Sequence, residues 1–138
     1  MKFDSNLEMK GRLTIAINDE VVQEIDNLVV TTGKGYVASR MKDATATAMS
    51  HMAIGTGSTA AAVGDTALGG ESARVALTST TVSGADITYV ATFGAGTGTA
   101  AITEAAVLNA SSSGTMLCRT VFAVVNKEIG RASCRERV

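Results

Sequence analysis

The sequence contains no proline and no tryptophan, and aromatic side chains of any kind are scarce. Without proline, the turns must be made by Gly, Ser, Thr and Asn residues. Aromatic residues make up 4% of the chain and hydrophobic residues 46%, so the core must consist mainly of Val, Ala, Leu, Ile and Met side chains. A chain of 138 residues is long enough for a single domain with a modest core.

Neither an excess of charge nor a long hydrophobic run is present. The formal net charge is −1, which gives no basic surface for a phosphate backbone, so we expect no nucleic-acid partner. No apolar run reaches the roughly 18 residues that a membrane span requires, so we expect no membrane partner. The N-terminal residues, MKFDSNLEMK, lack the apolar segment of a signal peptide. We therefore expect a protein that is made in a cytoplasm and stays there or leaves inside an assembly.

Residues that carry catalytic or metal chemistry are scarce too. His51 is the only histidine, which excludes a zinc site built from several histidines, and no nucleophile elbow marks a serine that it could activate. Cys118 lies within a predicted strand, where a thiol serves as a small buried hydrophobe. Asp65, Glu71 and Asp86 do not form the spaced acidic loop of a calcium site. The sequence therefore predicts no enzyme, no metal site and no cofactor.

Two glycine-rich segments are similar in composition to loops that hold phosphate groups. They are Gly-Ala-Gly-Thr-Gly at 94–98 and Gly-Thr-Gly at 55–57. Neither has the spacing of a dinucleotide fingerprint, and neither is followed by a long helix or a Lys-Ser/Thr pair. We interpret both segments as ordinary turns.

Alternating apolar and polar residues predict several strands. The clearest pattern covers 87–93, where Ile87, Tyr89, Ala91 and Phe93 alternate with Thr and Val residues. Weaker patterns predict further strands over 12–17, 21–25, 49–54 and 71–79. The first two of these are expected to form a hairpin that ends at 26–27.

One segment has the longer period of a helix. From 32 to 42 the apolar and long side chains recur three to four residues apart, and Thr31 or Thr32 is available as the N-cap. The apolar stripe of this helix, formed by Tyr36, Val37 and Met41, is expected to cover a sheet face. An irregular loop is the alternative for this segment. Together the elements predict a mainly β fold: an antiparallel β-sandwich or a partly closed barrel with one short α-helix.

The segment 100–122 predicts a β-hairpin at the centre of the fold. Strands over 102–108 and 115–122 flank a polar turn at 109–114 that ends in glycine. Both faces of the second strand are largely apolar, so we expect the hairpin to be covered on more than one side.

Two charged residues, Glu104 and Arg119, interrupt this apolar hairpin, one on each strand. A buried charge without a partner is costly, so each side chain should be paired. Glu104 and Arg119 could pair with each other, Arg74 could pair with Glu104 or with Glu71, or one of the charges could meet a neighbouring subunit. We take these four residues as a candidate structural ion-pair site or interface.

The segment 128–138, EIGRASCRERV, differs in composition from the rest of the chain. It is rich in arginine, and one permitted choice of codons for it resembles a common short-read sequencing adapter. We therefore interpret 1–127 as a single β-rich domain, truncated at its C-terminus, and 128–138 as a non-native tail; a basic, cysteine-containing tail is the alternative. On this interpretation Cys118 is the only native cysteine, no internal disulfide is expected, and deletion of 128–138 should leave folding unharmed.

Four short phrases, taken together, carry a resemblance to known proteins. They are SHMAIGTG at 50–57, TALG at 66–69 followed by Glu71 and Arg74, YVATF at 89–93, and ITE at 102–104 with RTVF at 119–122. The phrases resemble small structural proteins of tailed bacteriophages, which are common in environmental sequence. Their order is similar to that of the N-terminal attachment domain of phage tail-collar fibres.

In that attachment domain, an A-x-G-x-G strand precedes an L-x-x-E-x-x-R segment and an I-x-E-x-G-L-F strand. The chain departs from the last motif at Ala106, which replaces the glycine, and at Leu108, which replaces the aromatic residue. The resemblance covers 11–127. It implies a further strand after the VNK segment at 125–127, a strand that we take to be missing here.

The resemblance implies a virion structural protein, and more narrowly a tail-fibre or baseplate component that assembles as a homo-oligomer. Its partners would be other copies of itself and other virion proteins, and it would be made in the host cytoplasm. A capsid decoration protein is one alternative. A host-glycan-binding module is another, but it requires exposed aromatic residues, whereas Tyr89, Phe93 and Phe122 are expected to be buried.

Overall fold

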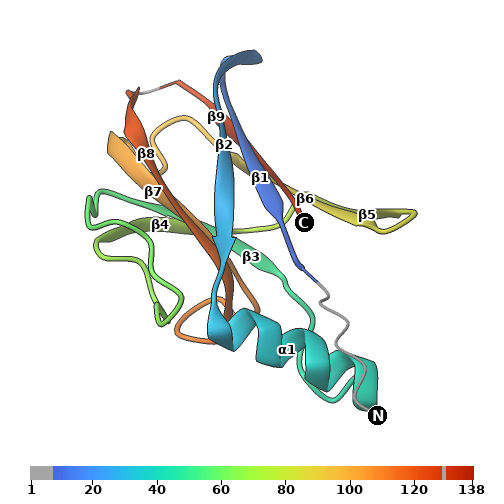
Figure 1. Cartoon of the computed structure of the whole chain (residues 1–138). Helices are drawn as coiled ribbons and strands as arrows, with labels where there is room; N and C mark the ends of the chain where they lie inside the picture. The colour runs from blue at the N-terminus through green and yellow to red at the C-terminus, as the bar shows by residue number, and fades with distance from the viewer. Residues whose placement is uncertain (1–7, 129) are drawn as a thin grey trace.

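The computed structural model describes residues 8–128 and 130–138 of the chain (Figure 1). In this part of the chain the elements follow one another in the order β1 (Gly11–Ile17), β2 (Glu20–Val29), α1 (Thr31–Lys42), β3 (His51–Gly55), β4 (Glu71–Ala76), β5 (Ser79–Ser83), β6 (Asp86–Phe93), β7 (Ala100–Leu108), β8 (Met116–Lys127) and β9 (Ala132–Arg137). The predicted mainly β fold with one short helix is confirmed.

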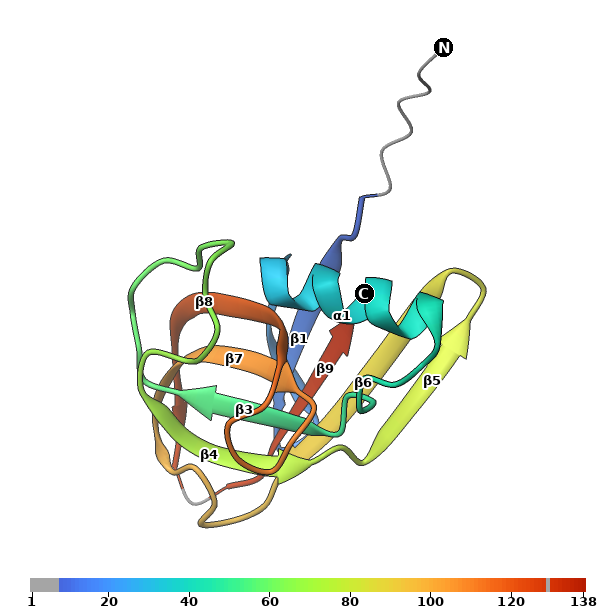
Figure 2. The ribbon, with the colours of Figure 1, turned by 90° about the horizontal axis from the view of Figure 1, so that it is seen from below.

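All of these strands belong to one antiparallel sheet in the order β4-β3-β7-β8-β2-β1-β9-β6-β5. The sheet curls into a half-barrel (Figure 2), which corresponds to the predicted partly closed barrel. The two edge strands, β4 and β5, are consecutive in the chain. Between them, Leu77 N–H donates to Ser50 O next to β3 at 2.9 Å, and Thr78 N–H donates to Val90 O on β6 at 2.7 Å. This short linker therefore connects the two edges of the curled sheet.

The core consists mainly of aliphatic and small side chains, as the composition predicts. Leu13, Met52 and Phe93 are fully buried in it. On β6, Tyr89, Ala91 and Phe93 are buried while the residues between them are half-buried, which confirms the phase predicted for 87–93. The predicted hairpin of β7 and β8 lies in the interior of the strand order, between β3 and β2.

Replacement of Phe93 by Ala is expected to lower the free energy of unfolding by roughly 3–5 kcal/mol, because it removes a fully buried aromatic ring and leaves a cavity. Denaturant titration would measure the change. Val124→Ala is the control, since Val124 is 56% exposed and its truncation should have little effect. A loss below about 1 kcal/mol for Phe93→Ala would contradict this packing.

The helix α1 lies at the end of the half-barrel where β2 finishes (Figure 1). Its N-cap is Val30, without a side-chain hydrogen bond, so the prediction of a threonine N-cap is wrong. The Thr32 hydroxyl instead donates to Met116 O on β8 at 3.0 Å. A Cβ on Gly33 would lie 2.1 Å from Leu117 O, so glycine permits the first turn of α1 to touch β8.

The predicted apolar stripe of α1 is only partly correct. Tyr36 and Val37 pack against the core, whereas Met41 is 76% exposed. Within the described residues, α1 is too short and too polar to cross a membrane.

Two predicted strand boundaries are wrong. β2 continues past 26–27 to Val29 because Asn27 and Asp26 still pair with Gly11 and Arg12 on β1. The strand predicted over 71–79 is divided at 77–78, where the chain leaves β3 and joins β6.

The strand β9 packs inside the fold, although 128–138 was interpreted as a tail whose deletion would leave folding unharmed. β9 lies between β1 and β6 and pairs with both: Cys134 is opposite Ile15 on one side and Ala91 on the other. Ala132, Cys134 and Glu136 are buried, and Arg135 and Arg137 are exposed. This period-two alternation is that of a strand with one face on the core. β9 fills the place of the strand that was expected to be missing. The adapter origin of the segment stays a prediction.

One buried residue of β9, Glu136, is poorly matched to its surroundings. Its side chain accepts hydrogen bonds from Asn27 Nδ2 at 2.5 Å and from the Thr120 hydroxyl at 3.5 Å, with no cation beside it among the described contacts. Burial therefore raises the pKa of Glu136 to about 7. Asn27 Oδ1 is buried without a hydrogen-bond donor.

Glu136→Gln is expected to stabilise the protein above neutral pH by on the order of 2–3 kcal/mol, because an amide avoids the buried charge. The unfolded carboxyl loses its proton near pH 4.5, whereas the folded one keeps it up to about pH 7. The unfolded state binds fewer protons in this window, so the stability of the parent chain falls as the pH rises through it.

Urea titrations of the parent chain and Glu136→Gln across this window would measure the effect. Glu24→Gln is the matched control because Glu24, on β2, is exposed. If the stability of the parent chain does not fall between pH 4.5 and about pH 7, the burial of an uncompensated Glu136 carboxyl is contradicted.

Candidate functional site

Glu104 on β7 and Arg119 on β8 form a buried ion pair. Arg119 Nη2 and Nε donate to Glu104 Oε2 at 2.8 and 3.1 Å. The side chain of Arg119 is 3% exposed and that of Glu104 is 0% exposed. In the β7–β8 register Arg119 is opposite Ala106, so the two charged residues are diagonal neighbours on adjacent strands. Of the arrangements considered from the sequence, the pairing of Glu104 with Arg119 is the one present, and the pairing of Arg74 with Glu104 is not.

Three glycine N–H groups also bind the Glu104 carboxylate. Gly57 and Gly70 donate to Oε1 at 2.9 and 2.7 Å, and Gly69 donates to Oε2 at 2.9 Å. A Cβ on Gly57 would lie 2.5 Å from Glu104 Oε1, so glycine is needed for this close approach. The interpretation of 55–57 as an ordinary turn is therefore wrong: the segment helps to bind an anion, and the anion is the chain's own carboxylate.

Arg119 also holds the outer part of the loop 56–70. Its Nη2 donates to Thr59 O at 3.0 Å, and its Nη1 donates to Asp65 Oδ2 at 2.8 Å and to Ala60 O at 3.5 Å. Sequence reasoning considered Asp65 only as a calcium ligand and missed this role. We refer to the assembled group as the Glu104 cluster: Glu104, Arg119, Asp65 and the N–H groups of Gly57, Gly69 and Gly70.

The ionisable members of the Glu104 cluster stabilise one another in their charged forms. Burial acts to raise the pKa of Glu104, but hydrogen bonds from the glycine N–H groups and from Arg119 outweigh it and lower that pKa. Burial acts to lower the pKa of Arg119, but hydrogen bonds to Glu104 and Asp65 raise it. The hydrogen bond from Ala62 N–H lowers the pKa of Asp65, against the smaller opposing effect of burial.

The arrangement suits the Glu104 cluster to holding a loop and not to proton transfer. The Glu104 oxygens already accept five hydrogen bonds, and the side chain does not reach solvent. The loop 56–70 contains no described strand or helix, and most of its residues are exposed. The Glu104 cluster therefore fixes an exposed loop to β7 and β8.

The other predicted pair, Glu71 and Arg74, lies at the β4 edge of the sheet. Arg74 Nη2 and Nε donate to Glu71 Oε1 and Oε2 at 2.7 and 3.1 Å. Arg74 Nη1 also donates to Ala110 O and Ser113 O, each at 2.9 Å, which ties β4 to the β7–β8 turn. The Glu71 side chain is 36% exposed, so water screens this pair more than the Glu104 cluster. The four predicted residues thus form two separate pairs.

The next residues to consider are those that were weighed for catalysis or metal binding. Ser50 Oγ and His51 Nδ1 are 2.8 Å apart on neighbouring residues. Cys118 is buried, as predicted, and burial raises the pKa of its thiol; Cys134 is also buried, and both cysteines are free. No cluster of three or more His, Cys, Asp or Glu residues suitable for a metal ion occurs among the residues described.

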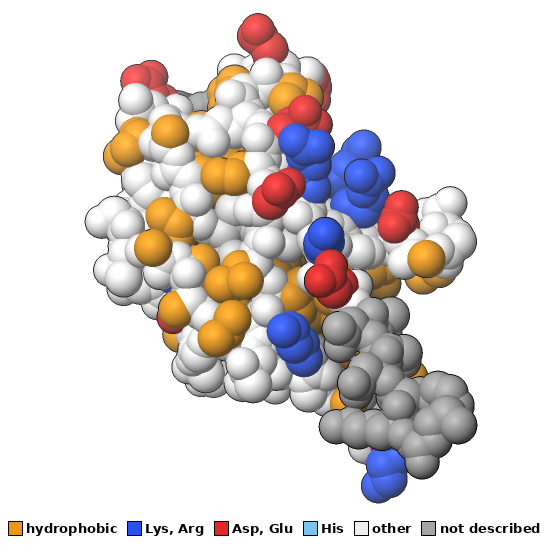
Figure 3. Space-filling model, in the orientation of Figure 1, with side chains coloured by type: hydrophobic (Ala, Val, Ile, Leu, Met, Phe, Trp, Pro, Cys, Tyr) orange, Lys and Arg blue, Asp and Glu red, His pale blue; other side chains and the backbone are white. Residues whose placement is uncertain are grey.

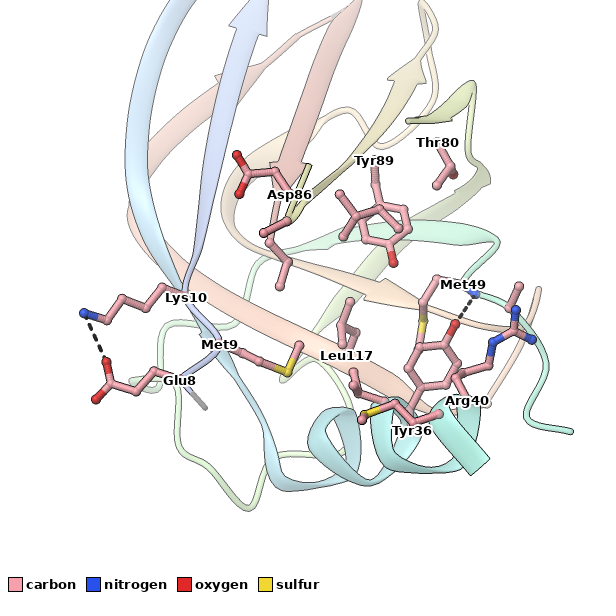
Figure 4. Close-up of a pocket in the computed structure, with 16 residues that line it drawn as sticks. Glu8, Met9, Lys10, Tyr36, Arg40, Met49, Thr80, Asp86, Tyr89 and Leu117 are labelled. Carbon is pink, nitrogen blue, oxygen red and sulfur yellow. Dashed lines mark hydrogen bonds and ion pairs between the residues drawn. The ribbon is translucent and has the colours of Figure 1, made fainter. Parts of the chain in front are cut away.

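A groove of about 940 Å³ lies between α1 and the β5–β6 hairpin (Figure 4). We refer to it as the α1 groove. Tyr36, Met49, Tyr89 and Leu117 line its interior, and Tyr36 is held in place because its hydroxyl accepts a hydrogen bond from Met49 N–H at 3.2 Å. Sequence reasoning missed the groove because its residues come from segments that are far apart in the chain.

The charged side chains on the face in Figure 3 are mixed in sign. Toward the right of this view, lysine and arginine side chains lie beside aspartate and glutamate side chains, whereas the left is mainly uncharged. Such a face offers no continuous basic stripe of the kind that holds a nucleic-acid backbone.

The chain matches no protein-family model, no curated protein and no solved structure in the comparisons made.

Proposed function

We propose that this chain is a structural protein of a tailed-bacteriophage virion, a tail-fibre or baseplate component that works by binding other subunits. One observation carries the proposal. Residues of the phrases that resemble such proteins lie far apart in the sequence but meet at a single carboxylate: Gly57, Gly69 and Arg119 all donate to Glu104. Residues that carry the resemblance therefore belong to the Glu104 cluster, which holds the loop 56–70 on the sheet.

The construction of the Glu104 cluster favours a binding role. Its charged groups already bind one another and the backbone of the loop. The outer residues of the loop, such as 58–60 and 62–64, are exposed. A loop that is fixed at its base loses little conformational entropy when a partner binds, so it can present a preformed surface. The partners would be other copies of the chain and other virion proteins.

Subunit binding is favoured over the glycan-binding alternative by the placement of the aromatic residues. Tyr89, Phe93 and Phe122 are buried, and Tyr36 is half-buried in the α1 groove. In the described part of the chain no aromatic ring is exposed for stacking on a sugar. Phe3 lies outside the described residues.

Immunogold electron microscopy would test the proposal. Antibodies against the recombinant chain would be applied to virus particles purified from a sample that carries the gene, with antibody pre-adsorbed on the recombinant chain as the control. Gold particles on tails are expected. Gold on heads would favour the decoration-protein alternative, and absence of gold from particles, with the antigen present in the unassembled fraction, would overturn the virion assignment.

A further inference from the structure

The two edges of the curled sheet differ in how well they are protected from pairing with another strand. At the β4 edge, the register shifts next to Gly55, and the Glu71–Arg74 pair adds charge and a tie to the β7–β8 turn. Irregularities and charges of this kind prevent an edge from accepting a further strand. β5, with the sequence STTVS, has none of them: its register with β6 is regular, all of its residues are exposed and none is charged.

The hydrogen bonds of β6 show which backbone groups of β5 face outward. Ile87 N–H donates to Val138 O at 2.9 Å, and Val138 N–H donates to Ile87 O at 2.8 Å, so both polar groups of Ile87 are used on the β9 side. Val82 is opposite Ile87, and its N–H and C=O must therefore point to the free side. By the same alternation, Thr80 also presents its N–H and C=O outward.

The sequence of β5 is complementary to itself in an antiparallel arrangement. If two copies meet about a two-fold axis at Thr81, Thr80 of each copy lies opposite Val82 of the other. These are the outward-facing positions, so each such pair would exchange its N–H and C=O groups. The opposed side chains are uncharged and β-branched, which suits cross-strand packing.

The α1 groove gives an independent reason for two copies to meet at β5. Thr80 and Met41 line the α1 groove, and Val82 is on the same face of β5 as Thr80 because strand side chains alternate. Met41 and Val82, at 76% and 71%, have the highest exposed fractions among the exposed large hydrophobic residues described. A second copy on the β5 edge would cover Val82 and bring apolar side chains to the rim of the α1 groove.

We propose that β5 pairs with β5 of a second copy of this chain, so that two half-barrels share one continuous sheet in a two-fold dimer. The proposal rests on the subunit-binding role proposed above and adds a second contact surface to the loop 56–70. Pairing of this kind uses up the unprotected edge in both copies. Because the β4 edge is protected from pairing, no third copy should add to the shared sheet, and assembly through the sheet edges should stop at the dimer.

Sedimentation equilibrium of the full chain over a concentration series would test the proposal. The parent chain should dimerise, and Val82→Lys should raise the dimer dissociation constant at least about tenfold, because it places a charge in the contact. Val124→Lys is the matched control, since Val124 is an exposed valine of β8, away from β5, and should dimerise like the parent. Val82→Pro should also weaken the dimer, because it removes an outward N–H without breaking the β5–β6 ladder.

Amide hydrogen exchange supplies a second measurement that needs no variant. The Thr80 and Val82 N–H groups should exchange more slowly in concentrated than in dilute samples of the parent chain. A chain that stays monomeric throughout the series, or a dimer unaffected by Val82→Lys with fast exchange at both residues, would overturn the β5 contact. Neither result bears on the gold labelling of virus particles, so failure of this proposal is distinguishable from failure of the virion assignment.

Discussion

Arg119→Gln is expected to lower the free energy of unfolding by about 3–5 kcal/mol, the cost of leaving a buried charge without its partner. Arg119 supplies two of the hydrogen bonds to Glu104 and also holds Asp65 and Thr59 O. Glutamine is shorter and uncharged, so it leaves the Glu104 carboxylate buried with only its glycine N–H donors. Urea titration at neutral pH would measure the loss.

A double-mutant cycle separates the pair from the rest of the Glu104 cluster. Glu104→Gln alone should also destabilise, but the double variant should lose less than the sum of the single losses, because neither charge is then left unpaired. Arg131→Gln is the control: Arg131 pairs with Asp19, both at least half exposed, and its loss should stay within about 1 kcal/mol. Additive losses at Glu104 and Arg119 would contradict the internal pair.

The same pair predicts a pH dependence. Because the pKa of Glu104 is lowered in the folded state, the stability that it contributes is complete above the carboxyl's unfolded pKa. That stability is lost as the pH falls through the lower, folded pKa. The acid limb of the stability profile should therefore be shallower in Glu104→Gln than in the parent chain.

Deletion of 128–138 is expected to abolish cooperative folding. Without β9, the facing sides of β1 and β6 lose the hydrogen bonds of two ladders. The buried core residues Ile15, Ala91 and Phe93 are each opposite a β9 residue. Without β9 they would be exposed to water. Thermal melts by circular dichroism of the full and trimmed chains would measure the effect.

Arg135→Ser is the control for this deletion, because Arg135 lies on β9 but points to solvent. It should leave the melt nearly unchanged. A trimmed chain that still melts cooperatively within a few degrees of the full chain would show that the β9 position is dispensable, and it would restore the expectation that the segment is a tail without a role in folding.

The sequence by itself determined the local structure of this protein. Alternation of apolar and polar residues indicates burial residue by residue, so it placed the strand at 87–93, the central hairpin and the short helix. The same reasoning predicted that Glu104 and Arg119 would each have a partner, because an unpaired buried charge is costly, and pairing with each other was one of the arrangements that it allowed.

Only the tertiary structure decided which distant segments meet. The glycines that bind Glu104 are 34 to 47 residues away from it in the chain, and no local pattern relates a loop N–H to a particular carboxylate. The placement of β9 was decided in the same way. Composition set its segment apart from the rest of the chain. In the fold, β9 pairs with both β1 and β6, and hydrogen bonding between backbones depends little on which side chains a strand carries.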